Sequence, residues 1–195
     1  MDFTFSEDQL LFQDSVRDFL VNEITPDAIR ASWKTDTGRS DNIWTQLTEL
    51  GLTGMTVPVE FGGLGMNEID FVLLAQECGY VALPEPLVHT VLVAVPLIKS
   101  LSEDLKAEWL PKIAAGEAKV VVGLTENQFV EDAHIANLLL LQHGDEIHAV
   151  SADAVKLTHN ESMDLSRKLY SVEWIPSDSS CVASGGEGRA LIEAS

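Results

Sequence analysis

Residues 44–65, WTQLTELGLTGMTVPVEFGGLG, are the stretch of this chain that decides the fold. Apolar side chains from Trp44 to Leu50 recur at helical spacing, and the helix they predict ends at Gly51. A short apolar run follows, and then a loop with glycines at Gly62, Gly63 and Gly65. Because glycine allows close backbone approaches that a side chain would forbid, we expect this loop to lie against another surface.

Helical patterns occupy the chain on both sides of this stretch, up to about residue 115. Ser6 and Gln9 fit a capping box for a first helix that ends before Pro26. The predicted helices span residues 6–23, 41–50, 68–81, 85–100 and 103–115. The segment 85–100 is the most apolar of them, so we expect it in the centre of a bundle.

From Lys119 onward the pattern changes to short strands. Strands are predicted at 120–125, 134–142, 146–150, 153–158, 168–175 and 181–183, with a hairpin turn at 143–145. The fold class is therefore α+β, with an N-terminal helical bundle followed by a small β-sheet or barrel-like domain. We place an all-α domain at 1–117, a β-domain at 118–184, and a linker (GGEG, 185–188) with the start of a further helix in 185–195.

Composition excludes several classes of function. The chain of 195 residues carries 31 acidic and 12 basic residues, a formal net charge of −19. Nucleic-acid binding and docking on anionic membranes both need basic surface, so we expect neither partner. No apolar run reaches the roughly 18 residues of a membrane span, and the N-terminus has no secretory signal. Together with two widely separated cysteines, Cys78 and Cys181, this predicts a cytoplasmic protein with reduced thiols.

Four segments, in order along the chain, resemble the acyl-CoA dehydrogenases, flavoproteins that desaturate acyl-CoA thioesters between Cα and Cβ. They are FSEDQLLFQDSVRDFL (5–20), the stretch 44–65, LKAEWLPKIAAGEAKVVVGLTE (105–126) and GDEIHAVSADAVKLTHN (144–160). The resemblance implies a helical domain followed by a β-domain, in agreement with the change in period. It also implies a second helical domain beyond residue 195 that carries the catalytic glutamate, so no catalytic base is assigned in this chain.

The same resemblance implies FAD as cofactor and identifies the residues that would face it. Val122, Leu124 and Thr125 match the strand beside the flavin ring, with the Thr125 hydroxyl toward its pyrimidine edge. Leu157 and Thr158 match the second flavin-facing segment. Hydrogen-bond donors at these positions would stabilise negative charge on reduced flavin.

Two departures from the family pattern affect this site. After Thr125-Glu126 the family has Pro and a small Gly-Ser-Asp element, whereas this chain has NQFVED at 127–132, and only Asp132 matches. The tryptophan found two residues before the threonine of the second segment is Lys156 here. Such departures resemble the heteromeric branch of the family that acts on CoA thioesters of steroid side chains, as do DAHIANLLLLQHGDEIHAV (132–150) and DLSRKLYSVEW (164–174).

Other motifs favour ordinary structural roles. His143 and His148 flank the hairpin turn, but no cysteine or carboxylate completes a ligand set with metal-site spacing, so we expect surface histidines. Glu131 and Asp132 are neighbours on a strand and would point to opposite faces, so we expect solvated charges. The glycine loop at 62–65 does not have GxGxxG spacing and does not predict a Rossmann site.

The sequence thus predicts a subunit or fragment of an FAD-dependent acyl-CoA dehydrogenase. Its expected partners are an acyl-CoA thioester, a like or unlike dehydrogenase subunit, and electron-transfer flavoprotein or a similar acceptor. The alternatives are a non-catalytic scaffold that completes the active site of a partner, and a simple acyl-CoA carrier without flavin.

Overall fold

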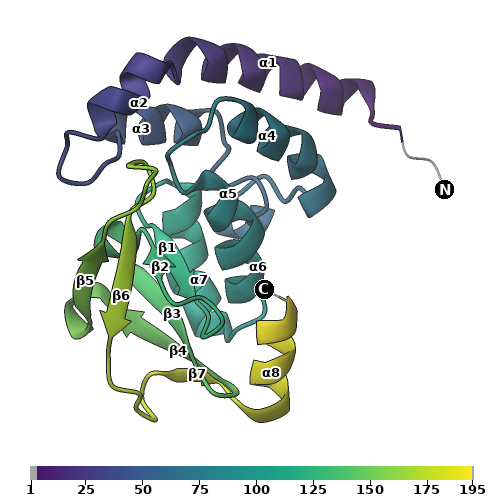
Figure 1. Cartoon of the computed structure of the whole chain (residues 1–195). Coiled ribbons are helices and arrows are strands. Elements are labelled where there is room, and N and C mark those ends of the chain that lie inside the picture. Colours follow the sequence, from purple (N-terminus) through teal and green to yellow (C-terminus); the bar gives the residue numbers. More distant parts are fainter. Residues whose placement is uncertain (1–3, 195) are drawn as a thin grey trace.

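The computed structural model describes residues 4–194, and helices build its N-terminal half (Figure 1). The helices are α1 (Glu7–Glu23), α2 (Pro26–Ser32), α3 (Asp41–Glu49), α4 (Glu68–Tyr80), α5 (Leu87–His89), α6 (Val95–Lys99) and α7 (Glu103–Ala114). The outermost residues of the predicted domains, 1–3 and 195, lie outside the described part. The helical half confirms the first part of the predicted fold class.

The helix termini follow the capping residues of the sequence. Ser6 and Gln9 form the predicted capping box at the start of α1. Ser102 caps α7, as predicted. Helix α2 was not predicted, because Pro26 was interpreted only as a stop. The structure instead places Pro26 in the first turn of α2, where its missing N–H costs nothing, and Thr25 caps the helix.

The predicted helix 85–100 contains a wider turn. A π-helical segment, Thr90–Ala94, joins α5 to α6. Pro96 lies directly after it and has no N–H to complete the regular helical ladder, which is a common cause of such irregular turns. Val91, Val95 and Ile98 are at most 1% exposed, which confirms the prediction that this segment is core.

The glycine loop folds back on the chain just before it. Leu64 N–H donates to the Gly54 carbonyl at 3.0 Å, and Gly65 N–H donates to the Val57 carbonyl at 2.9 Å. A Cβ added to Gly63 would overlap the Val57 carbonyl oxygen and would lie 2.6 Å from the Gly54 oxygen. The predicted close approach is therefore present, and it is made to the chain itself.

The C-terminal half contains two small sheets in the order β1-β3-β4-β7 and β2-β6-β5. The strands are β1 (Val120–Gly123), β2 (Val130–Glu131), β3 (Leu138–His143), β4 (Glu146–Ser151), β5 (Lys156–Asn160), β6 (Leu169–Glu173) and β7 (Cys181–Ala183). Short 3₁₀ turns occupy Val59–Phe61, Ala133–Ile135 and Ala152–Ala154. Strand β1 pairs in parallel with β3, and β3 forms the predicted hairpin with β4.

Two predicted strand starts and one linker prediction differ from the structure, and one strand was not predicted. The strand predicted from 134 begins at Leu138, and the strand predicted from 153 begins at Lys156, because 3₁₀ turns precede both. The two-residue strand β2 was not predicted. The GGEG linker is also wrong: these residues form the first turn of helix α8 (Gly185–Ala194). Gly188 makes that helix possible, because a Cβ there would overlap the Asp145 carbonyl oxygen of the hairpin turn.

The halves are joined by shared apolar core and by polar contacts. One cluster places β1, β3 and β4 residues against α6 and α7, and a second fills the space between the two sheets. The β5–β6 connection reaches the N-terminal helices (Figure 1), where Ser166 accepts hydrogen bonds from Trp33 Nε1 at 2.7 Å and Arg39 Nη1 at 2.6 Å. These contacts fix the β5–β6 connection against the helical half.

Candidate functional site

The predicted flavin-facing residues of β1 lie at its C-terminal end. Val122 is buried in the core that β1 shares with the helices, and Leu124 packs half-buried against the same cluster. Thr125 follows the strand and is exposed. Its N–H donates to Gln142 Oε1 of β3 at 3.0 Å, which fixes the backbone at this position. Only Leu124 and Thr125 of this group can therefore reach a ligand outside the core.

His89 holds the same strand from the helical side, and the sequence interpretation missed it. Its Nε2 accepts the Val122 N–H at 3.0 Å. Burial lowers the pKa of His89, so the ring is neutral and can act as this acceptor. A single histidine within the apolar run 85–100 was the signal in the sequence that could have found it.

The second predicted segment forms β5 at the edge of the other sheet. Leu157 packs into the core between the sheets, whereas Thr158 is exposed on the opposite face. Thr158 pairs with Ser171 in the register of β5 and β6. Within residues 4–194, neither the Thr125 nor the Thr158 hydroxyl forms a hydrogen bond, so both are available to a ligand.

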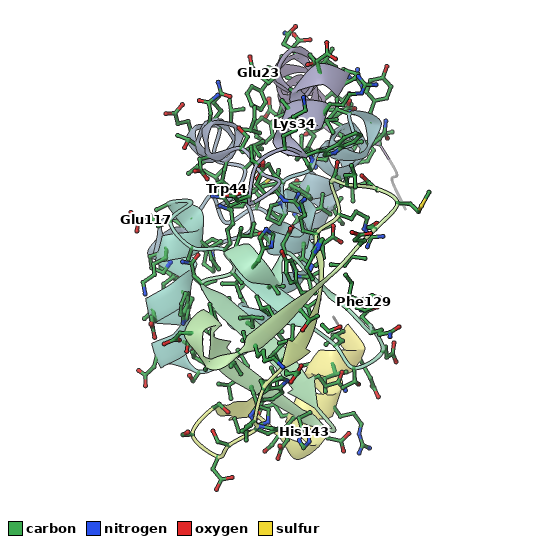
Figure 2. All side chains as sticks on the ribbon, turned by 60° about the vertical axis from the view of Figure 1, so that its left-hand side comes forward. Glu23, Lys34, Trp44, Glu117, Phe129 and His143 are labelled. Carbon is green, nitrogen blue, oxygen red and sulfur yellow. The ribbon has the colours of Figure 1, made fainter. Side chains whose placement is uncertain are left out.

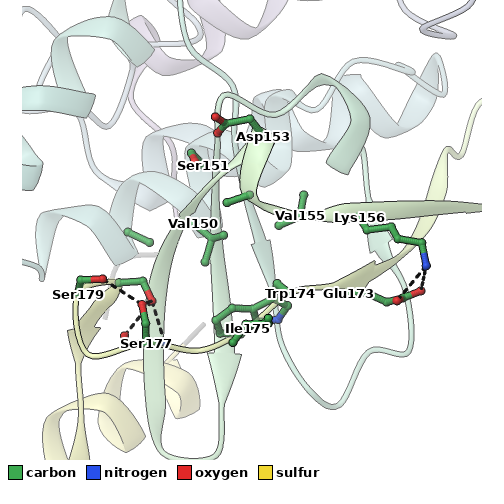
Figure 3. A pocket seen from close by; sticks show the side chains of 13 residues that line it. Val150, Ser151, Asp153, Val155, Lys156, Glu173, Trp174, Ile175, Ser177 and Ser179 are labelled. Carbon is green, nitrogen blue, oxygen red and sulfur yellow. Dashed lines mark hydrogen bonds and ion pairs between the residues drawn. The ribbon is translucent and has the colours of Figure 1, made fainter.

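Lys156, which stands where the family has tryptophan, shares the face of Thr158. Lys156 Nζ lies 3.0 Å and 3.1 Å from the two carboxylate oxygens of Glu173 on β6 (Figure 3). Both side chains line a hollow of about 790 Å³ that also includes Trp174 and Ser177. The Lys156–Glu173 ion pair therefore occupies the face of β5 that also carries Thr158. Charged groups lie there, where the family has the aromatic plane of a tryptophan.

The loop after β1 carries two acidic residues with different environments. Glu131 is exposed and pairs with Arg167 at 3.1 Å. Asp132 is 3% exposed and accepts a hydrogen bond from Arg39 Nη2, so the prediction of a solvated charge is wrong for Asp132. Burial raises the pKa of Asp132 to about 7, although Arg39 opposes that shift. Asp132 adopts φ +61°, outside the extended strand on which the prediction depended.

These residues fit one part of FAD and not another. Two exposed, unbonded hydroxyls and the apolar Leu124 suit the polar edge and the plane of an isoalloxazine ring. The loop 127–132 instead contains two carboxylates, and both are bound to arginines of this chain. A diphosphate at this loop would need small residues and positive charge. The donor set therefore fits the ring, and the loop does not fit the diphosphate.

The hairpin turn holds a second group of polar side chains. His143, Glu146 and His148 each present one ligand atom, and these atoms lie within 4.8 Å of one another. His148 is 2% exposed, so the prediction of two surface histidines is wrong for it. The prediction that no carboxylate completes a ligand set is also wrong, because Glu146 groups with the two histidines. His143 lies at the opposite end of the molecule from Glu23 and Lys34 (Figure 2).

The arrangement of helices and sheets is similar to that found within longer solved chains. It is similar to a chain of the ChsE4-ChsE5 complex from Mycobacterium tuberculosis, with a TM-score of 0.80 and 17% identity over 98% of this chain and 61% of that chain. A variant of the Tcur3481-Tcur3483 steroid ACAD gives a TM-score of 0.78 and 18% identity over 96% of this chain and 59% of that chain. At these identities the likeness shows the fold alone.

The sequence shows the family. Residues 6–117 match the acyl-CoA dehydrogenase N-terminal domain, and the chain belongs to the acyl-CoA dehydrogenase family. It is 29% identical over 168 residues to acyl-CoA dehydrogenase IpdE2 of Mycolicibacterium smegmatis, which covers 86% of this chain and 52% of that protein. The chain thus spans about half the length of this relative. Between residues 4 and 194, no helix has both the length and the apolar character needed to cross a bilayer.

Proposed function

We propose that this chain forms the helical domain (1–117) and β-domain (118–184) of an FAD-dependent acyl-CoA dehydrogenase. The observation that carries the proposal is the pair of exposed, unbonded hydroxyls of Thr125 and Thr158, at positions matched to the flavin-facing segments. With FAD bound, the flavin would accept hydride from the Cβ of an acyl-CoA thioester. Residues 185–195 would lead into the next helical domain, and the α-proton would be removed by a base outside this chain.

In this proposal, the chain orients the ring and shields one side of it. Leu124 would supply apolar contact, Val122 would support Leu124 from the core, and Thr125 and Thr158 would bond the polar atoms of the ring. Leu157 would hold β5 in place from the core between the sheets. A partner, either a second copy or an unlike dehydrogenase subunit, would supply the positive charge that the loop 127–132 lacks. The thioester class is that of steroid side chains, because 132–150 and 164–174 resemble that branch. Electron-transfer flavoprotein or a similar protein would reoxidise the flavin.

The test is the flavin content of the assembled protein. The chain is produced together with a candidate partner subunit, and the visible spectrum is recorded before and after addition of acyl-CoA. We expect flavin absorption that bleaches with substrate. Thr125→Val and Thr158→Val should each weaken FAD binding about tenfold, the effect of one lost hydrogen bond to the ligand. The control is Thr45→Val, on an exposed helical position, which should leave FAD binding unchanged.

A second candidate function is supported by the ion pairs at the site. Lys156 with Glu173, and Glu131 with Arg167, occupy positions where the family has flavin-facing or small residues. In this alternative the chain is a scaffold that completes the active site of a partner. This chain would then be colourless by itself and would form an active complex with a dehydrogenase-like partner. If substitution of both threonines has no effect on the activity and flavin content of that complex, the scaffold is established and the first proposal is refuted.

A further inference from the structure

The geometry of the β3–β4 hairpin brings three metal-ligating side chains to one face. His143 and Glu146 are directly opposite each other in the strand register, on either side of the turn Gly144–Asp145. His148 lies two residues beyond Glu146 on the same strand, so it projects to the same face. Gly144 adopts φ +61°, which a tight turn of this kind requires. The backbone therefore places all three side chains together without strain.

Ser180 is the polar partner of His148 Nδ1, at 2.9 Å. Ser180 Oγ also lies 2.9 Å from the Ser177 carbonyl. While the Ser180 hydroxyl donates to that carbonyl, its oxygen can accept the hydrogen of His148 Nδ1. The other nitrogen, Nε2, then has a free lone pair in the neutral ring.

That lone pair faces a carboxylate. His148 Nε2 is 3.2 Å from Glu146 Oε2, and His143 Nδ1 is 3.8 Å from the same oxygen. In the tautomer with the hydrogen on Nδ1, the Nε2 lone pair and the carboxylate oxygen are two acceptors, and a cation between them would bind both. We propose that His143, Glu146 and His148 bind a divalent transition-metal ion of the zinc class.

The spacing of the ligand atoms suits such an ion. Zinc–nitrogen and zinc–oxygen bonds of about 2.1 Å in a tetrahedron separate the ligand atoms by about 3.4 Å. The distances of 3.2 Å and 3.8 Å lie within half an ångström of this value. His143 is 62% exposed, so its ring can turn to close the third distance. Water would fill the remaining position.

The surroundings hold the site in place. A metal-bound histidine commonly donates its second N–H to a fixed acceptor, and Ser180 has that role for His148. Trp174 packs edge-on against the rings of His148 and His143, with centroid distances of 5.0 Å and 6.4 Å. The adjacent carboxylate, Asp145, is bound to Arg189 at 2.6 Å and does not compete for the ion.

The test uses the 195-residue chain, freed of metal with a chelator and prepared without a histidine tag. Binding of Zn²⁺ is measured by titration calorimetry, and Co²⁺ is used as a visible-absorption probe of the ligand geometry. We expect one ion per chain and a higher melting temperature with Zn²⁺. His143→Asn and Glu146→Gln, both on exposed or half-exposed turn positions, should each weaken binding about tenfold or more. Ser180→Ala should weaken it by about 10- to 100-fold.

Two control variants separate this site from other candidate ligands. His159→Asn removes an exposed histidine of β5 that stacks on Tyr170, and it should leave the affinity unchanged. Cys181→Ser removes the thiol on the strand paired with β4, and it should also bind normally. The proposal would be overturned if the wild-type chain does not bind Zn²⁺. It would also be overturned if His143→Asn and Glu146→Gln bind Zn²⁺ as tightly as the wild type. NMR spectra could instead show His148 with hydrogens on both ring nitrogens and no change on addition of Zn²⁺. That result would show that a proton lies between His148 and Glu146 in place of the metal ion.

Discussion

Arg39→Met is the most informative single substitution in the chain, because it breaks a buried ion pair between the two halves. The side chains of Arg39 and Asp132 are 3% and 5% exposed, so solvent screens their interaction little. Arg39 Nη1 also donates to the Ser166 carbonyl at 2.6 Å and to the Gly38 carbonyl at 3.0 Å. We expect the loss of these charge-assisted bonds to cost about 2–3 kcal/mol in the free energy of unfolding.

The cost should increase with pH. Burial raises the folded-state pKa of Asp132 to about 7 from an ordinary value of 3.8. The contribution of Asp132 to stability therefore falls as the pH rises toward about 7, and it becomes constant above that value. Without Arg39 the pKa of Asp132 rises further, so the variant continues to lose stability as the pH rises above 7. At pH 8 the cost should exceed the cost at pH 6 by on the order of 1 kcal/mol.

Urea unfolding at both pH values, followed by tryptophan fluorescence, measures this difference. Trp33 lies at the same contact through its bond to Ser166, and it reports the loss of the docked loop. The control is Arg30→Met, whose ion pair with Asp27 has side chains 61% and 98% exposed, and which should cost less than about 0.5 kcal/mol. A cost of Arg39→Met that is equal at pH 6 and pH 8, or below about 1 kcal/mol, would refute the reasoning.

Three further predictions concern stability, each measured by urea unfolding. Gly63→Ala should lower the free energy of unfolding by about 3 kcal/mol or more, because no space exists for a Cβ. The control Gly62→Ala should lower it by only about 1–2 kcal/mol, because a Cβ there meets no atom within 4 Å and only the φ of +84° is unfavourable. Equal losses for the two variants would contradict the close approach at Gly63. Leu139→Ala should cost about 2–5 kcal/mol, since the side chain is fully buried between the sheets, and a smaller loss would mean that the core collapses around the cavity. Glu77→Gln should lower the free energy of unfolding by about 1–2 kcal/mol at pH 7, because the hydrogen bond from Arg17 lowers the pKa of Glu77. The ionised Glu77 loses this advantage as the pH falls below the ordinary glutamate pKa, so the variant and the wild type should then become similar in stability. A stability difference at low pH as large as that at pH 7 would contradict this prediction.

The helical half could be predicted closely because its signals are local. The capping box of Ser6 and the caps of later helices depend on residues within one turn, so the sequence places them within about one or two residues. Pro26 misled the prediction because proline both ends one helix and begins another. The early strand starts were predicted wrongly for a related reason: 3₁₀ turns before β3 and β5 have the same apolar composition as the strands.

The candidate flavin site was only partly accessible from the sequence. The resemblance matched Leu157 and Thr158 to one flavin-facing segment, whereas the alternation of β5 places Leu157 inside and Thr158 outside. The sequence could not predict that Asp132 is buried, because its partner Arg39 is 93 residues away along the chain. The contact between His89 and Val122, 33 residues apart, was missed for the same reason.

The family and the division into helices and strands follow from the sequence alone, since both depend on local patterns and on the order of motifs along the chain. Only the tertiary structure decided which charges are buried and which polar groups meet. Burial and pairing depend on which distant segments pack together, and a residue pair such as His143 and Glu146 becomes a ligand set only when a specific register places both on one face.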